Sequence, residues 1–290
     1  MLAPLLQPGD TIGIISPSHV AVRERYASAL ADLRARGFRI KEAPNLYRDT
    51  YGFLATEQER AADLNAMARD PEVKLVFFGG GEGACELLPY LDWEAIRQNP
   101  KQYATYSDGT TILNAITART GLITYYGQMP GLFPEIGAYN WAQFRVNQMD
   151  GRADHLEPSG PWHALTGGVG EGRLIGGYLC NFLLMLGTPY LPLPEEERYV
   201  LFLEDHESFS DPSRVSALLS EIEQRPIIQR VTGVLFGHYA EREQPLLLAR
   251  LRRLGERHGI PVVACDDFGH GVNHAILPIG CRATLSADAL

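Results

Sequence analysis

Short apolar segments alternate with amphipathic segments through the first half of this 290-residue chain. The apolar segments have the length of buried strands, and the segments between them repeat apolar residues at helical spacing. Thr56 and Glu59 form the capping-box pattern that opens a helix. Strands are predicted at residues 11–16, 38–43, 73–78, 103–106 and 122–126, and helices at 21–36, from 56, at 84–88 and at 110–119. Such an alternation is typical of a parallel sheet with helices on both faces.

The alternation decays after residue 134, where Gly and Pro interrupt the chain at 150–151, 158–161 and 167–168. A second set of elements starts at residue 173. Strand-like segments lie at 199–204, 231–236, 261–265 and 282–286, and helix-like segments at 213–223 and 245–257. We therefore predict an α/β protein with an N-terminal domain at 1–135, a linker at 136–172 and a C-terminal mixed α/β domain at 173–290.

Composition and charge restrict the class of ligand. The formal net charge is −9 and no run of Lys or Arg stands out, which opposes binding to nucleic acid or to an anionic membrane. No stretch reaches the about 18 apolar residues of a membrane span, and the N-terminus lacks the basic start of a signal peptide. The four cysteines form no CxxC pair, so neither a zinc site nor a disulfide framework is expected. These features predict a cytoplasmic, reduced protein.

A glycine-rich segment at residues 79–83 follows the predicted strand at 73–78. Ligands of parallel sheets bind beyond the carboxyl ends of the strands, and glycines let a backbone approach a ligand closely. The segment matches neither the GxGxxG pattern of a dinucleotide site nor a phosphate-binding loop, and Glu82 would repel a phosphate. It is therefore either an oxyanion hole or substrate-contact loop, or a flexible turn between strand and helix.

Ser107 lies between the predicted strand at 103–106 and the predicted helix at 110–119. A serine on such a sharp turn is held outward, and the next backbone N–H points toward whatever the serine attacks. This placement favours a nucleophile. The alternative is an ordinary helix N-cap made by Ser107 or Asp108.

A serine nucleophile needs a base and a group that orients the base. His270 lies between two glycines just after the apolar strand at 261–265, where functional groups concentrate, and His274 and His238 compete with it. Glu204 ends the apolar strand at 199–204, where a buried carboxylate requires a partner. A plain ion pair at Glu204 is the alternative.

Several motifs, taken in order and spacing, resemble the LD-carboxypeptidase family of serine peptidases, which also includes the microcin C self-immunity proteins. The resemblance runs nearly end to end. Its motifs are LQPGDTIG (6–13), ERAADLN (59–65), GGEG (80–83), LLPYLD (87–92), YSD (106–108), TGLIT (120–124) with YG (126–127), GG (176–177), GTPY (187–190), LFLED (201–205) and GH (269–270).

The resemblance implies a Ser–His–Glu triad in which Ser107 is the nucleophile, His270 the general base and Glu204 the residue that orients His270. It implies an oxyanion hole and substrate contacts at Gly80, Gly81 and Asp108. It also implies a Rossmann-like N-terminal domain, a β-rich C-terminal domain, no metal or cofactor, and a cytoplasmic homodimer that acts on a small peptide or peptide conjugate.

Four positions depart from the family pattern: Gly79 replaces a usual Arg, Glu82 a usual aromatic residue, Gly109 a usual Ile or Val, and Tyr178 a usual Asn. None belongs to the implied triad, so the departures concern the substrate. We expect a serine carboxypeptidase that cleaves the L,D-bond of a murein tetrapeptide and releases D-Ala. The alternatives are an immunity-like amidase that cleaves aminoacyl- or peptidyl-nucleotide conjugates, and a ligand-binding homologue without catalysis.

Overall fold

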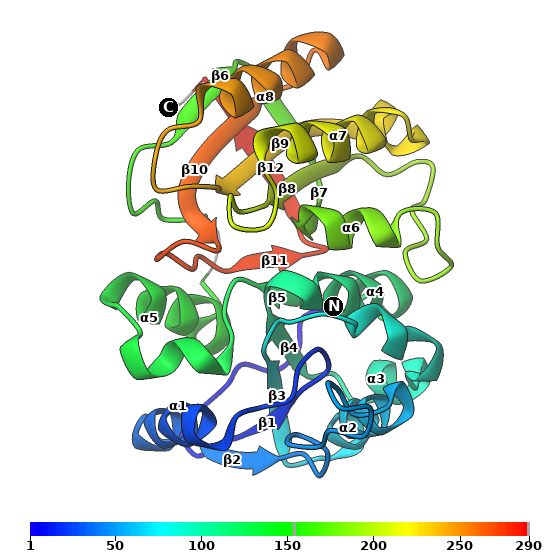
Figure 1. Cartoon of the computed structure of the whole chain (residues 1–290), viewed down its shortest axis with the longest axis vertical. Coiled ribbons are helices and arrows are strands. Elements are labelled where there is room, and N and C mark those ends of the chain that lie inside the picture. Colours follow the sequence, from blue (N-terminus) through cyan, green and yellow to red (C-terminus); the bar gives the residue numbers. More distant parts are fainter. Residues whose placement is uncertain (153–154, 289–290) are drawn as a thin grey trace.

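The computed structural model describes residues 1–152 and 155–288 of the chain. Two six-stranded sheets form two lobes, one above the other in Figure 1. The first lobe is coloured blue to green except for the red strand β11, and the second is mostly green to red. The predicted combination of an N-terminal parallel sheet and a second, mixed α/β sheet is therefore confirmed.

The first sheet has the order β11-β5-β4-β3-β1-β2, and all its pairs are parallel except that of β11 with β5. Parallel strands that are buried on both faces read as continuous apolar runs, which explains why 73–78 was predicted correctly. The strands are β1 (Thr11–Ile15), β2 (Arg39–Glu42), β3 (Val73–Phe78), β4 (Gln102–Thr105), β5 (Thr124–Tyr126) and β11 (Leu277–Ile279).

Helices cover both faces of the first sheet. On one face, α1 and α5 pack against Ile12, Ile14 and Phe77, and on the other α2, α3 and α4 pack against Val76 and Phe78. The helices are α1 (Arg23–Ala35), α2 (Glu57–Arg69), α3 (Trp93–Gln98), α4 (Thr110–Thr120) and α5 (Ala138–Phe144). The predicted capping box is present, because Thr56 accepts from the Glu59 N–H and Glu59 accepts from the Thr56 N–H.

The second sheet has the order β12-β7-β8-β9-β10-β6, with parallel pairs from β7 to β10 and antiparallel strands at both edges. Three helices, α6, α7 and α8, lie along it (Figure 1). The strands are β6 (His163–Thr166), β7 (Val169–Tyr178), β8 (Tyr199–Glu204), β9 (Val231–His238), β10 (Val262–Gly269) and β12 (Arg282–Ser286), and the helices are α6 (Leu179–Met185), α7 (Pro212–Glu223) and α8 (Pro245–His258).

Some elements differ from the sequence prediction. The expected linker contains α5, a π-helical turn at Arg145–Asp150 and strand β6, all too short to show a clear periodicity. The helix expected at 84–88 is a 3₁₀ helix (Ala84–Tyr90), which holds Pro89. The chain also returns from the second lobe to the first through β11, a three-residue strand. Among the described residues, no helix is both long and apolar enough to cross a membrane.

Arg60 on α2 joins the loops that follow β1 and β3. Its side chain, only 1% exposed, donates to the carbonyl oxygens of Ala55 (2.9 Å), Pro17 (2.5 Å) and Gly83 (3.1 Å), and it pairs with Glu86 (2.5 Å). Pro17 lies just beyond β1 and Gly83 ends the glycine-rich loop that follows β3, and these two strands are neighbours. Arg60 therefore fixes the carboxyl edge of the first sheet beside the glycine-rich loop.

We expect Arg60→Met to lower the free energy of unfolding by about 2–4 kcal/mol, because several acceptors lose a charged donor. Arg69→Met is the matched control on the same helix, since the Arg69 side chain is 56% exposed and pairs only at the surface with Asp92. The control should change stability by less than about 0.5 kcal/mol. Urea unfolding measures both, and equal stability of the two variants would contradict the role of Arg60.

Candidate active site

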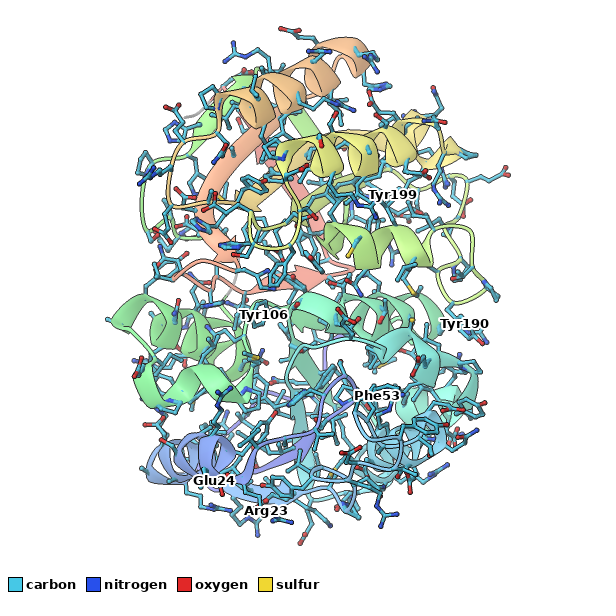
Figure 2. The ribbon with its side chains drawn as sticks, viewed as in Figure 1. Arg23, Glu24, Phe53, Tyr106, Tyr190 and Tyr199 are labelled. Carbon is cyan, nitrogen blue, oxygen red and sulfur yellow. The ribbon has the colours of Figure 1, made fainter. Side chains whose placement is uncertain are left out.

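Three polar side chains from strand ends of both sheets meet at the junction of the lobes. Ser107 follows β4, Glu204 ends β8 and His270 follows β10. The Ser107 Oγ lies 3.0 Å from His270 Nε2, and His270 Nδ1 lies 2.9 Å from Glu204 Oε2. Figure 2 shows Tyr106, the residue before Ser107, where the two lobes adjoin. The structure thus brings together the three residues singled out in the sequence.

Ser107 has an unusual backbone conformation. Its φ is 61°, and among the described residues it alone has a positive φ without being glycine. A left-handed conformation costs energy for a residue with a Cβ, and strain of this kind concentrates at functional sites. The Ser107 side chain makes no N-cap hydrogen bond, and α4 starts only at Thr110. The ordinary capping alternative is therefore not what this serine does.

Glu204 determines the tautomer of His270. A carboxylate accepts hydrogen bonds, so His270 Nδ1, which faces Glu204, carries the hydrogen of the neutral ring. His270 Nε2 is then free to accept from the Ser107 hydroxyl. Glu204 is fully buried, and it also accepts from the Tyr126 hydroxyl at 2.5 Å. Gly269, next to His270, leaves room for Glu204, because a Cβ at this position would lie 3.2 Å from Glu204 Oε2. The φ of Gly269 is +107°, which glycine adopts readily.

The two competing histidines are engaged elsewhere. His274 Nδ1 faces the Gly127 carbonyl oxygen at 3.1 Å, and burial lowers the pKa of His274 to about 4. His238 Nδ1 faces Asp266 Oδ1 at 2.8 Å. Of the three candidates for a base, His270 is the one that contacts Ser107.

The glycine-rich loop packs directly against Ser107. A Cβ on Gly80 would lie 2.8 Å from Ser107 Cβ, and one on Gly81 would lie 2.1 Å from the Ser18 carbonyl oxygen. Within the part of the chain that the structure describes, the N–H groups of Gly80 and Gly81 donate no hydrogen bond to protein. A loop held this close to the serine, with free donors, is suited to contact a substrate.

Asp108 supports the loop rather than facing solvent. Its buried carboxylate accepts from the Ala84 N–H at 2.7 Å and from Asn181 Nδ2 at 2.5 Å. Burial raises the pKa of Asp108. Because Ala84 follows the glycine-rich loop and Asn181 lies on α6, Asp108 joins the serine turn to that loop and to the second lobe.

Two of the four departures from the family pattern, Gly109 and Gly79, have local explanations. A Cβ on Gly109 would lie 2.2 Å from Thr105 Cγ2, so Thr105 already fills the space of a side chain at that position. The His19 ring fills the corresponding space at Gly79, because a Cβ on Gly79 would lie 2.8 Å from His19 Cε1. Tyr178 places its ring centroid 5.2 Å from that of His270, and Glu82 is exposed within the glycine-rich loop.

Sequence reasoning missed several residues around the three. Phe209, although 61% exposed, lies with its ring centroid 5.1 Å from that of His270. Asp205 is fully buried, and burial raises the pKa of its carboxyl to about 6. Tyr126 contacts both Glu204 and the Ser107 N–H. The signal for Tyr126 was its position at the end of a strand next to the one that precedes Ser107.

No group of three or more His, Cys, Asp or Glu side chains able to hold a metal ion occurs among the described residues. Cys85, Cys180, Cys265 and Cys281 are free thiols.

Comparison with known proteins identifies the family. Residues 12–127 match the family model of the LD-carboxypeptidase N-terminal domain, and residues 171–285 match that of the LD-carboxypeptidase C-terminal domain. The chain belongs to the LD-carboxypeptidase family. The resemblance seen in the motifs is thereby confirmed, and with it membership in a group of serine peptidase-type hydrolases.

The relatives of this LD-carboxypeptidase family member include both murein peptide carboxypeptidases and MccF-like proteins. It is 30% identical to the probable murein peptide carboxypeptidase of Bacillus subtilis, with 97% of this chain and 90% of that protein covered. An MccF-like protein from Bacillus anthracis superposes with a TM-score of 0.89 at 27% identity, covering 100% of this chain and 97% of that one. The muramoyltetrapeptide carboxypeptidase from Oxalobacter formigenes superposes with a TM-score of 0.79 at 25% identity, covering 95% and 94%.

The buried His274 should make the stability of the protein depend on pH. The ordinary pKa of the imidazole is 6.5, and the folded-state pKa is about 4. Between these values the unfolded chain binds a proton that the folded chain does not, so stability falls as the pH is lowered through this window. From pH 7 to pH 5 the loss from this group should be about 2 kcal/mol.

His274→Gln removes that proton uptake, so the variant should lose about 2 kcal/mol less than the wild type between pH 7 and pH 5. Urea unfolding at both pH values measures the difference. His163→Gln, which changes an exposed histidine on β6, should follow the wild type. The same pH dependence in His274→Gln and wild type would show that His274 is not held neutral.

Proposed function

We propose that the chain is a serine carboxypeptidase that hydrolyses an amide bond at the C-terminal end of a small peptide. The observation that supports this most directly is the continuous contact from Ser107 Oγ through His270 to the buried Glu204 carboxylate. The strained turn at Ser107 adds to it, because the same kind of turn exposes the nucleophile of other serine hydrolases.

In the proposed reaction, His270 Nε2 takes the proton of the Ser107 hydroxyl while Oγ attacks the carbonyl carbon. The oxyanion accepts hydrogen bonds from main-chain N–H groups at Gly80, Gly81 and Asp108, commonly the largest electrostatic contribution to such a step. Glu204 stabilises the imidazolium that forms. His270 then gives its proton to the leaving amine, and water hydrolyses the acyl-enzyme by the same route in reverse.

For the substrate, we propose the L,D-bond of a murein tetrapeptide, with D-Ala as the product released. The names of the Bacillus subtilis relative and of the Oxalobacter formigenes structure support this choice. A second candidate is an amide that links an acidic amino acid to a modified nucleotide. The close superposition on the MccF-like protein favours it, as do the aromatic rings of Tyr178 and Phe209 beside His270.

Ser107→Ala should lower turnover by a factor on the order of 10³–10⁶, because members of a triad act as a unit. His270→Ala should have a similar effect, whereas His163→Ala, at an exposed position of β6, should leave turnover unchanged. Mass spectrometry of a murein tetrapeptide incubated with each protein measures the release of D-Ala. Full turnover by Ser107→Ala would overturn the assignment of the nucleophile.

The same assay with aspartyl-sulfamoyl adenosine separates the two substrate classes. Release of D-Ala alone supports the murein peptide, and release of aspartate alone supports the nucleotide conjugate. Cleavage of neither by a folded protein would favour the ligand-binding alternative and would contradict the proposed activity.

We also propose, from the family resemblance, that the enzyme is a cytoplasmic homodimer. Light scattering during gel filtration should then give twice the mass of one chain, and a single-chain mass would contradict the dimer.

A further inference from the structure

The hydrogen bonds around the proposed triad do not end at Glu204. Tyr126 accepts from the Ser107 backbone N–H at 3.0 Å, and its hydroxyl donates to Glu204 Oε1 at 2.5 Å. Glu204 Oε2 faces His270 Nδ1, and His270 Nε2 faces Ser107 Oγ. The contacts therefore form a closed ring that leaves Ser107 through its amide and returns through its hydroxyl.

The direction of each bond at Tyr126 is determined by its partners. A backbone N–H can only donate, so the Tyr126 oxygen must accept from Ser107. An ionised carboxylate can only accept, so the Tyr126 hydrogen must point to Glu204. No other arrangement of the hydroxyl hydrogen satisfies both partners.

The fold holds the Tyr126 hydroxyl in this position. Tyr126 is fully buried, and it is paired with Thr105 in the parallel ladder between β5 and β4. Its ring lies 5.3 Å from that of Phe202 on β8 and 6.5 Å from that of Tyr106, measured between centroids. Burial and the nearby Glu204 raise the pKa of Tyr126 well above its ordinary value, so the phenol stays a neutral donor.

We propose that Tyr126 is a positioning residue that sets both the backbone of the nucleophile and the basicity of the proposed general base. Its hydroxyl accepts from the Ser107 N–H and so holds Ser107 in the left-handed conformation. By donating to the Glu204 carboxylate, the same hydroxyl weakens the attraction between Glu204 and His270. This inference rests on the proposed function for its kinetic consequence, but the link between Tyr126 and His270 can be measured on the resting protein.

Removing the hydroxyl changes His270 in a defined direction. Glu204 loses one donor, so its negative charge acts more fully on His270 and favours the imidazolium. The pKa of His270 should therefore rise. Other titratable groups near this pair are unchanged by the substitution: Tyr106, Tyr178, Asp205, His206 and His274. His238 lies one ring further away, against His206.

Tyr126→Phe is the test, and Tyr103→Phe is its matched control. Tyr103 is also fully buried on the same sheet, in β4, but its hydroxyl has no hydrogen-bond partner among the residues that the structure describes. We expect Tyr126→Phe to lower kcat by about 10- to 100-fold with little change in KM. The acid limb of the kcat/KM–pH profile of Tyr126→Phe should shift to higher pH by about half a unit to one unit. Tyr103→Phe should leave both unchanged.

Two measurements keep this inference separate from the proposed activity. NMR titration of the His270 ring needs no substrate, and it should show a raised pKa in Tyr126→Phe alone. Incorporating 3-fluorotyrosine at position 126 preserves the size of the ring and strengthens the donor, so the pKa of His270 should fall. An unchanged His270 titration in both Tyr126 variants would overturn the inference, whereas absent turnover in the wild type would contradict only the proposed function.

Discussion

The buried carboxylate of Glu204 is the charge on which the arrangement of the site depends. An ionised group without exposure is costly unless it is paired, and Glu204 has one partner from each lobe. Tyr126 reaches it from the first sheet, and His270 reaches it from the end of β10 in the second. The two lobes must therefore meet closely at this point, because separating them would leave the carboxylate with a single partner.

Glycines make that close meeting possible. A Cβ on Gly177, at the end of β7, would lie 2.4 Å from Thr110 Oγ1 at the start of α4. The same hydroxyl donates to the Ser107 carbonyl oxygen at 2.7 Å and accepts from the Tyr178 N–H at 3.0 Å. The second lobe thus contacts the serine turn through its backbone as well as through His270. Gly177 therefore lets the two lobes pack closely at this point.

The sequence was most informative where a strand is buried on both faces. The runs at 73–78 and 199–204 have the predicted bounds, and the polar residues after such runs led to Glu204, Ser107 and His270. Strand β11 and helix α5 were missed, since three and seven residues carry too little periodicity. Tyr126 was missed as a site residue because a tyrosine in an apolar strand looks like core. Its contacts become visible only when strand pairing and the junction of the lobes are known.

If the ring acts as a single unit, the losses from removing its members will not multiply. The most direct test is the murein tetrapeptide turnover of Ser107→Ala, His270→Ala and the double variant, each corrected for the uncatalysed rate. We expect the double variant to be no slower than the slower single variant, as for groups that take part in one proton transfer. A double variant whose loss equals the product of the two single losses would show that Ser107 and His270 act independently.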